Sequence, residues 1–151
     1  LHLCDRRQRQ MCIRDSTRGG YGQHGETYEN ENGVIWWSHG GELKGGSPAR
    51  IQFLLDIMEE NGGYMEPLPA FFDETCCTNS ASHPRKDCVM YYYGANRPCR
   101  RPFYMPEGQE FDVEVIDTWN MTITQAGRHS GEFTIDMPSR PYMAVRLVKV
   151  K

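Results

Sequence analysis

The sequence predicts a mostly β protein, in which a small antiparallel β-sandwich follows a strand, a loop and a helix that remain from a truncated α/β domain. Three observations predict this class. Short segments of alternating hydrophobic and polar residues fill the second half of the chain, and one helix with clear end signals precedes them. The few strand-like pieces before that helix cannot bury its apolar side by themselves. A chain of 151 residues suits one domain, or one small domain with a remnant of another.

The strand segments are separated by residues that favour turns. Hydrophobic and polar side chains alternate in FDVEVIDTW (111–119), GEFTIDM (131–137) and YMAVRLVKV (142–150), and CVMYYYG (88–94), RPFYM (101–105) and NMTITQ (120–125) are further candidates. Turn sequences lie between them at 94–96, 106–108, 126–127 and 138–139. About six or seven short strands at this spacing are typical of a small sandwich.

The helix is predicted in SPARIQFLLDIMEENGG (47–63). Ser47 is a good N-cap, and Pro48 suits the first helical position because its missing N–H would have no partner there. Apolar residues recur at three- and four-residue steps, and Asn61-Gly62-Gly63 ends the helix. The expected apolar stripe consists of Ile51, Leu54, Leu55 and Met58.

Residues 1–16 are excluded from the fold argument. Within them, QMCIRDS (10–16) reads as the in-frame translation of a transposase-end sequencing adapter, and the segment has no apolar stretch or cleavage site of a signal peptide. We therefore expect an artefactual, disordered stretch at 1–16, the end of an α/β domain at 17–61, a linker at 62–70 and the sandwich at 71–151. On this interpretation the chain is a fragment, cut off on its N-terminal side.

Composition argues against several classes of function. A net charge of −3 argues against a nucleic-acid partner, and no apolar run is long enough for a membrane span. Outside 1–16 the cysteines are Cys76, Cys77, Cys88 and Cys99, whose clustering does not suit a disulfide framework. We expect reduced thiols and a cytoplasmic protein. A metal cluster that also uses His83 is the alternative, but adjacent cysteines followed by long gaps fit zinc spacing poorly.

Several motifs resemble one family. They are GGYGQHGETY (19–28), VIWWSHGGELKGGSPARI (34–51), YYYGANRP (91–98), DVEVIDTWNMTI (112–123) and SGEFTIDMPSRPYMAVRL (130–147). Together they are similar to the C-terminal part of bacterial apiosidase-like glycoside hydrolases, in which a (β/α)8 barrel is followed by a β-sandwich of unknown function. The resemblance implies that residues 17–61 are the last strand, loop and helix of the catalytic barrel.

The resemblance also implies what the chain binds and lacks. Carbohydrate would be the partner through the complete parent protein, the N-terminal barrel segment would be missing, and no cofactor or metal is expected. Glycosidases ordinarily use two carboxyl groups, and in barrels of this type these come from earlier strands. The chain would therefore be inactive alone. The alternative is a non-catalytic module that binds carbohydrate or braces a barrel.

Candidate site residues follow from the barrel interpretation. If GYGQH (20–24) is the last barrel strand, then His24, Glu26 and Tyr28 lie at the active-site rim, and Trp36 and Trp37 lie in the next loop, where an indole could stack on a sugar. A second register, with VIWW (34–37) as the strand, moves His24 to the opposite end. Structural hydrogen bonding by His24 and Glu26, and core packing by the tryptophans, are the alternatives.

The segment Asp117-Thr118-Trp119-Asn120 allows two interpretations. It follows a predicted strand and could form a carbohydrate-binding corner. Asp and Asn side chains also commonly stabilise turns, and a tryptophan beside them is commonly buried. The sequence leaves both open.

Overall fold

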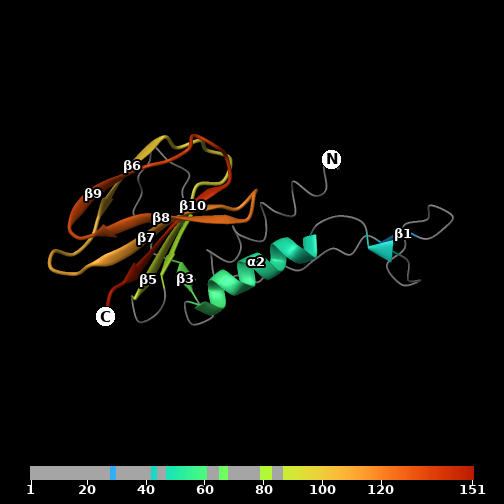
Figure 1. The fold of residues 1–151 in the computed structure, drawn as a ribbon, viewed down its shortest axis with the longest axis horizontal. Helices are drawn as coiled ribbons and strands as arrows, with labels where there is room; N and C mark the ends of the chain where they lie inside the picture. Colours follow the sequence, from blue (N-terminus) through green and yellow to red (C-terminus); the bar gives the residue numbers. More distant parts are fainter. Residues whose placement is uncertain (1–27, 30–41, 44–46, 61–64, 68–78, 83–86) are drawn as a thin grey trace.

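The computed structural model describes residues 28–29, 42–43, 47–60, 65–67, 79–82 and 87–151 (Figure 1). One helix and ten strands lie in this part of the chain. They are β1 (Tyr28–Glu29), β2 (Glu42–Leu43), α2 (Ser47–Glu60), β3 (Glu66–Pro67), β4 (Asn79–Ser82), β5 (Cys88–Tyr92), β6 (Arg100–Tyr104), β7 (Phe111–Asp117), β8 (Thr122–His129), β9 (Glu132–Asp136) and β10 (Met143–Lys149). No helix in these ranges is long and apolar enough to cross a membrane.

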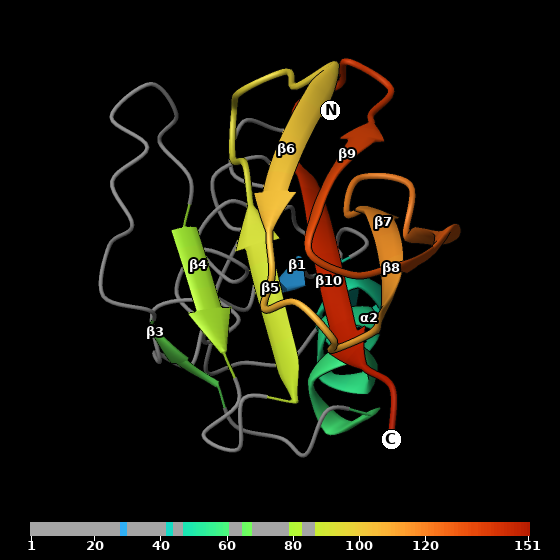
Figure 2. The same cartoon turned by 90° about the vertical axis from the view of Figure 1, so that its left-hand side faces the viewer.

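The strands form one large sheet and a small one. The large sheet has six strands in the order β3-β4-β5-β10-β7-β8, and every neighbouring pair is antiparallel. Strands β6 and β9 form a separate antiparallel pair that covers one face of it (Figure 2). The predicted mostly β fold, a small antiparallel sandwich preceded by a helix, is confirmed.

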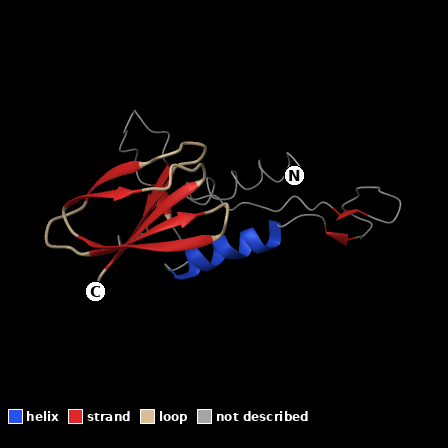
Figure 3. Cartoon of the chain, turned by 45° about the horizontal axis from the view of Figure 1, so that its top comes forward, coloured by secondary structure: helices blue, strands red, loops and turns tan. Residues whose placement is uncertain are grey.

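Each face of the large sheet has its own hydrophobic core. The core between the two sheets contains Val113, Val145 and Leu147 from the central strands, with Phe103 and Ile135 from β6 and β9. The core on the other face lies between the sheet and α2, which runs along that side of the strands (Figure 3). Its buried members are Ile57, Met58, Met65, Cys88, Met90, Tyr92, Ile116 and Ala144.

The predicted alternation along the strands is confirmed. Phe111, Val113 and Val115 belong to the core between the sheets, as do Met143, Val145 and Leu147, while Ile116 and Ala144 point to the helix. Both faces of β10 are therefore buried, because the helix covers the face that would be exposed in a two-layer sandwich.

Helix α2 begins and ends as the sequence predicts, but its predicted apolar stripe is partly wrong. The side chains that contact the sheet core are Phe53, Leu54, Ile57 and Met58. Leu55 is 44% exposed, and both Leu55 and Ile51 of the predicted stripe lie outside that core. The segment FLLDIM holds more apolar residues than one packed face requires, so periodicity alone did not identify the face that meets the sheet.

Part of the segment expected to be a linker belongs to the large sheet. Met65 is buried in the core beneath α2, and β3 pairs with β4 at the edge of the sheet. Pro67 is compatible with this position because an edge strand leaves one side without ladder partners.

The predicted barrel strand (20–24) and its alternative (34–37) lie outside the described residues, as do residues 1–16. Of the segment before α2, the structure describes β1 and β2, a short antiparallel pair in which Tyr28 faces Leu43. In Figure 1 this pair lies beyond the N-terminal end of α2, away from the sheets.

We expect the helix to be stably docked. Amides of residues 51–58 should exchange slowly with solvent, at rates close to those of β5 and β10, because Ile57 and Met58 are buried against the sheet. Amide hydrogen exchange followed by NMR or mass spectrometry measures this. Rapid exchange throughout 51–58, beside protected strands, would contradict a fixed interface.

Candidate functional site

Of the site residues predicted from the barrel resemblance, Tyr28 alone lies in the described part of the chain, where it forms β1 with Glu29. His24, Glu26, Trp36 and Trp37 lie outside the described residues, so their predicted roles remain predictions.

The cysteines within the described ranges do not form a metal site. Cys88 and Cys99 are free, and no cluster of three or more potential metal ligands occurs among the described residues. Burial raises the pKa of the Cys88 thiol to about 12, which keeps it protonated and unreactive. Cys76, Cys77 and His83 lie outside the described residues.

A pocket of about 450 Å³ lies where three loops meet at one end of the central strands of the large sheet. The loops follow β5, connect β7 to β8, and precede β10; because these strands are antiparallel neighbours, the loops converge. The backbone N–H of Tyr142 donates to the carbonyl of Gly94, and the hydroxyl of Thr118 donates to the carbonyl of Tyr142 at 2.5 Å. The pocket is lined by Ala95, Arg97, Asp117, Trp119, Asn120, Arg140, Pro141 and Tyr142.

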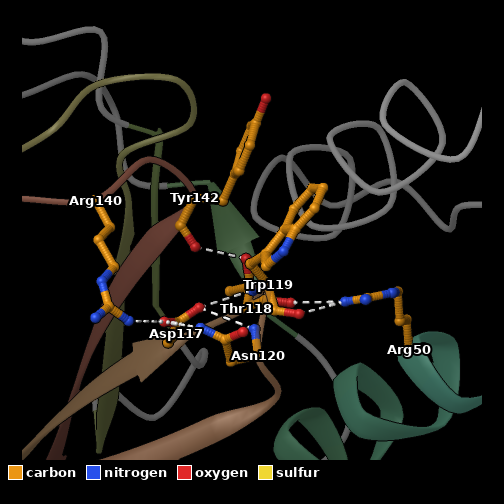
Figure 4. Close-up of polar contacts among 7 residues, drawn as sticks. All are labelled: Arg50, Asp117, Thr118, Trp119, Asn120, Arg140 and Tyr142. Carbon is orange, nitrogen blue, oxygen red and sulfur yellow. Dashed lines mark hydrogen bonds and ion pairs between the residues drawn. The ribbon is translucent and has the colours of Figure 1, made fainter. Parts of the chain in front are cut away.

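Asp117 organises the β7–β8 turn (Figure 4). Its carboxylate accepts hydrogen bonds from the backbone N–H groups of Trp119 and Asn120, both at 3.0 Å, and from the Asn120 side-chain amide at 2.8 Å. Arg140 lies 3.4 Å away and completes an ion pair. This is the turn-stabilising role that the sequence analysis left open for Asp117.

These contacts keep the carboxyl group of Asp117 ionised, although Asp117 is only 8% exposed. Burial acts to raise the pKa of its carboxyl, but the hydrogen bonds from Asn120, Trp119 and Arg140 outweigh burial and lower that pKa below its ordinary value. A carboxyl group with a lowered pKa cannot serve as the protonated acid of a glycosidase.

Trp119 is held between two side chains. Its ring stacks on that of Tyr142, with centroids 5.8 Å apart and 20° between the planes, and the guanidinium of Arg50 lies 5.6 Å from its centroid. In Figure 4 the indole lies between these two groups. Arg50 Nη1 also donates to the carbonyl of Trp119 at 2.6 Å. The indole therefore joins the sandwich to the first turns of α2.

The last turn of α2 is held by a second arginine. Arg146 on β10 is 5% exposed, and its guanidinium donates to Glu114 at 2.5 Å, to Glu60 at 2.9 Å and to the carbonyl of Ile57 at 3.4 Å. The last turn of α2 contains no basic residue, so Arg146 supplies from the sheet the cation that a helix C-terminus favours. Arg50 and Arg146 thus fasten α2 at both ends.

Three non-glycine residues in the loops around the pocket have left-handed backbone conformations. Among the described residues, the non-glycine positions with positive φ are Met121, Ser139 and Tyr142, at 56°, 52° and 65°. Tyr142 lines the pocket, and the other two adjoin the lining residues Asn120 and Arg140. Such conformations cost about 1–3 kcal/mol each and concentrate at functional sites.

The sequence identified the 117–120 segment but not its partners. Arg50 lies 69 residues before the carbonyl it binds, and Arg146 lies 86 residues after Glu60. Arg97, Arg140 and Tyr142 are separated from the turn by whole strands. No local pattern marks such contacts, because strand pairing and the docking of α2 create them.

The chain is similar to a solved protein from Bacteroides vulgatus described as a "putative glycoside hydrolase", with a TM-score of 0.75 and 26% identity. The similarity covers 97% of this chain and 32% of that protein, so the chain spans about a third of that protein's length. A second structure, described as "Glycoside hydrolase", has a TM-score of 0.48 and 11% identity over 66% of this chain and 24% of its own, which is too low to carry an argument. No curated protein matches the chain.

The fold and this similarity define the class as a β-sandwich protein related to glycoside hydrolases. Residues 73–148 match the family described as "Domain of unknown function (DUF5605)". This match covers half of the chain, and the protein belongs to that family.

Proposed function

We propose that this chain forms the accessory, non-catalytic sandwich of an apiosidase-like glycoside hydrolase, and that α2 joins the sandwich to a catalytic barrel. The proposal depends mainly on one observation, the fastening of α2 to the sheet by Arg50 at one end and Arg146 at the other. A helix held in this way transmits the position of the sandwich to whatever packs on its other side.

The exposed side of α2 supports this role. Phe53, Leu54, Ile57 and Met58 are used in the core with the sheet, while Leu55 remains 44% exposed. The similarity to part of a protein about three times as long supports an accessory role too. In this proposal His24, Glu26, Tyr28, Trp36 and Trp37 contribute to the rim of the barrel's active site.

The chemistry of the pocket also favours a non-catalytic role. Hydrolysis of a glycosidic bond ordinarily requires one protonated and one ionised carboxyl group on either side of that bond. Among the described residues that line the pocket, Asp117 is the single carboxylate, and its hydrogen bonds hold it ionised.

We expect the purified chain to release no sugar from glycosides. The measurement is an assay for reducing ends and for nitrophenol on a panel of polysaccharides and nitrophenyl glycosides, with a known glycosidase as positive control. The same assay on Asp117→Asn is the matched control. Activity that exceeds the buffer blank and co-purifies with the folded chain would overturn the non-catalytic role. Loss of that activity in Asp117→Asn would locate catalysis in the pocket.

A second candidate function, binding of carbohydrate by the sandwich, is favoured by the pocket. Trp119 and Tyr142 are both partly exposed and lie beside the polar side chains of Asn120, Arg97 and Arg140. Aromatic surfaces next to a few directed polar groups are typical of sites for small organic ligands. This candidate is compatible with the accessory role.

A further inference from the structure

We propose that the pocket at the β7–β8 turn binds an acidic sugar, a hexuronate unit of a saccharide, through Arg97 and Arg140. The inference rests on the proposed accessory role in a glycoside hydrolase and adds to it a ligand class and a binding site. It depends on the charge of the pocket, the availability of its cations and its rigidity.

The pocket has an excess of positive charge. Of its lining residues in the described part of the chain, two are arginines and one is a carboxylate, which leaves one net positive charge, although the chain as a whole carries −3. Arg140 shares part of its charge with Asp117 at 3.4 Å, and its side chain is 61% exposed. A local positive site on an acidic protein attracts an anionic ligand.

The cations are available to a ligand, whereas the carboxylate is not. Asp117 already accepts three hydrogen bonds and an ion pair, so it has little capacity left for a sugar hydroxyl. Arg97 is exposed and makes no ion pair with any residue in the described ranges. A guanidinium recognises a carboxylate through two parallel N–H donors, and a hexuronate presents such a carboxylate at the edge of its ring.

The size and the lining of the pocket fit a saccharide. A volume of about 450 Å³ lies within the range of about 300–1,000 Å³ that is usual for small-ligand sites. Trp119 and Tyr142 provide apolar surface for the C–H groups of a sugar ring, and Asn120 retains a side-chain carbonyl for a hydroxyl.

The pocket is held in shape before any ligand arrives. Asp117 fixes the turn, Arg50 holds Trp119 from α2, and positive φ angles at Met121, Ser139 and Tyr142 shape two of the three loops. A rigid site loses less conformational entropy on binding, which favours affinity for a ligand that makes few contacts. An acidic peptide presents the same carboxylate but not the apolar ring face, so the saccharide fits the aromatic lining better.

The test is an NMR titration of the full chain labelled with ¹⁵N. The probes are glucuronic acid and galacturonic acid, their short oligomers, and glucose and galactose as matched neutral sugars. Acidic sugars should shift the indole N–H of Trp119 and the amides of the 117–120 turn to saturation, and neutral sugars should bind at least about tenfold more weakly, since they lack the charge-assisted contact.

Arg97→Gln is the decisive variant, because Arg97 makes no described ion pair and its loss should leave the fold intact. We expect it to weaken binding of the acidic sugar about tenfold, which is typical of the loss of one charged hydrogen bond. Arg100→Gln is the matched control: Arg100 is exposed, lies three residues away and pairs with Asp136 outside the pocket, so affinity should not change.

Three results would overturn the proposal. They are the absence of saturable shifts with acidic sugars, equal affinity for the neutral sugars, and tighter binding of a glutamate hexapeptide at the same resonances. None of them contradicts the accessory role, which the turnover assay tests separately. Conversely, turnover by the chain would contradict that role even if acidic sugars bind.

Discussion

Replacing Arg146 with alanine is expected to destabilise the protein by about 3–5 kcal/mol, since it removes the cation from a buried ion pair and leaves its partner uncompensated. The partner is Glu114, whose side chain is largely buried on the sheet face beneath α2. Glu60 is more exposed and can turn to water, which places the expected loss near the lower end of that range. The carbonyl of Ile57 would lose the hydrogen bond from Nη1 as well.

The measurement is urea denaturation followed by tryptophan fluorescence, with hydrogen exchange of residues 51–58 as a local readout. Exchange in α2 should speed up more than exchange in β6 and β9, because the helix loses its C-terminal attachment. Arg128→Ala is the control: Arg128 pairs with Asp112 and both are exposed, so its loss should change stability much less. Equal effects of the two substitutions would refute the proposed role of Arg146.

Replacing Asp117 with alanine is expected to destabilise the protein by about 2–3 kcal/mol and to abolish binding in the pocket. Two backbone N–H groups of the turn lose their acceptor, and unsatisfied polar groups at a partly buried site are costly. The Trp119–Tyr142 stack depends on the same turn. Asp117→Asn keeps one acceptor oxygen and should lose less stability. Chemical denaturation of both variants therefore separates the contribution of the hydrogen bonds from that of the charge.

Asp117 also gives stability a pH dependence of known sign. The pKa of Asp117 is lowered in the folded protein, whereas the pKa of an unfolded aspartate is about 3.9. The folded state therefore binds fewer protons, and this contribution to stability is fully present above about pH 4 and is lost as pH falls through the lower folded value. Melting temperatures at pH 5 and pH 3 should differ less in Asp117→Asn than in the parent. An identical difference in the two proteins would mean that Asp117 contributes no linkage.

The local elements of the fold follow from short stretches of sequence. Period-two alternation placed Phe111, Val113 and Val115 on one face of β7, and Ser47 with Pro48 marked the start of α2. These signals are reliable because each depends on neighbours within a few residues, whose backbone geometry repeats along a strand or a helix.

The packing of α2 did not follow from its sequence. Its hydrophobic residues exceed one stripe, so the helix could have turned any of several faces to the sheet, and Leu55 was assigned to the wrong one. Met65 and Glu66–Pro67 were expected in a linker, yet they complete the core and the sheet edge. Which face is buried depends on where the sheet lies.

The sequence likewise predicted one part of the candidate pocket and missed the rest. The composition of segment 117–120 predicted a turn, because Asp and Asn side chains form hydrogen bonds with backbone groups two or three residues away. Arg97, Arg140 and Tyr142 meet the turn through the antiparallel order of β5, β10 and β7, and Arg50 reaches it through the docking of α2. Sequence determines such a site through the whole fold, because contacts between distant residues exist only after the strands have paired and the helix has docked.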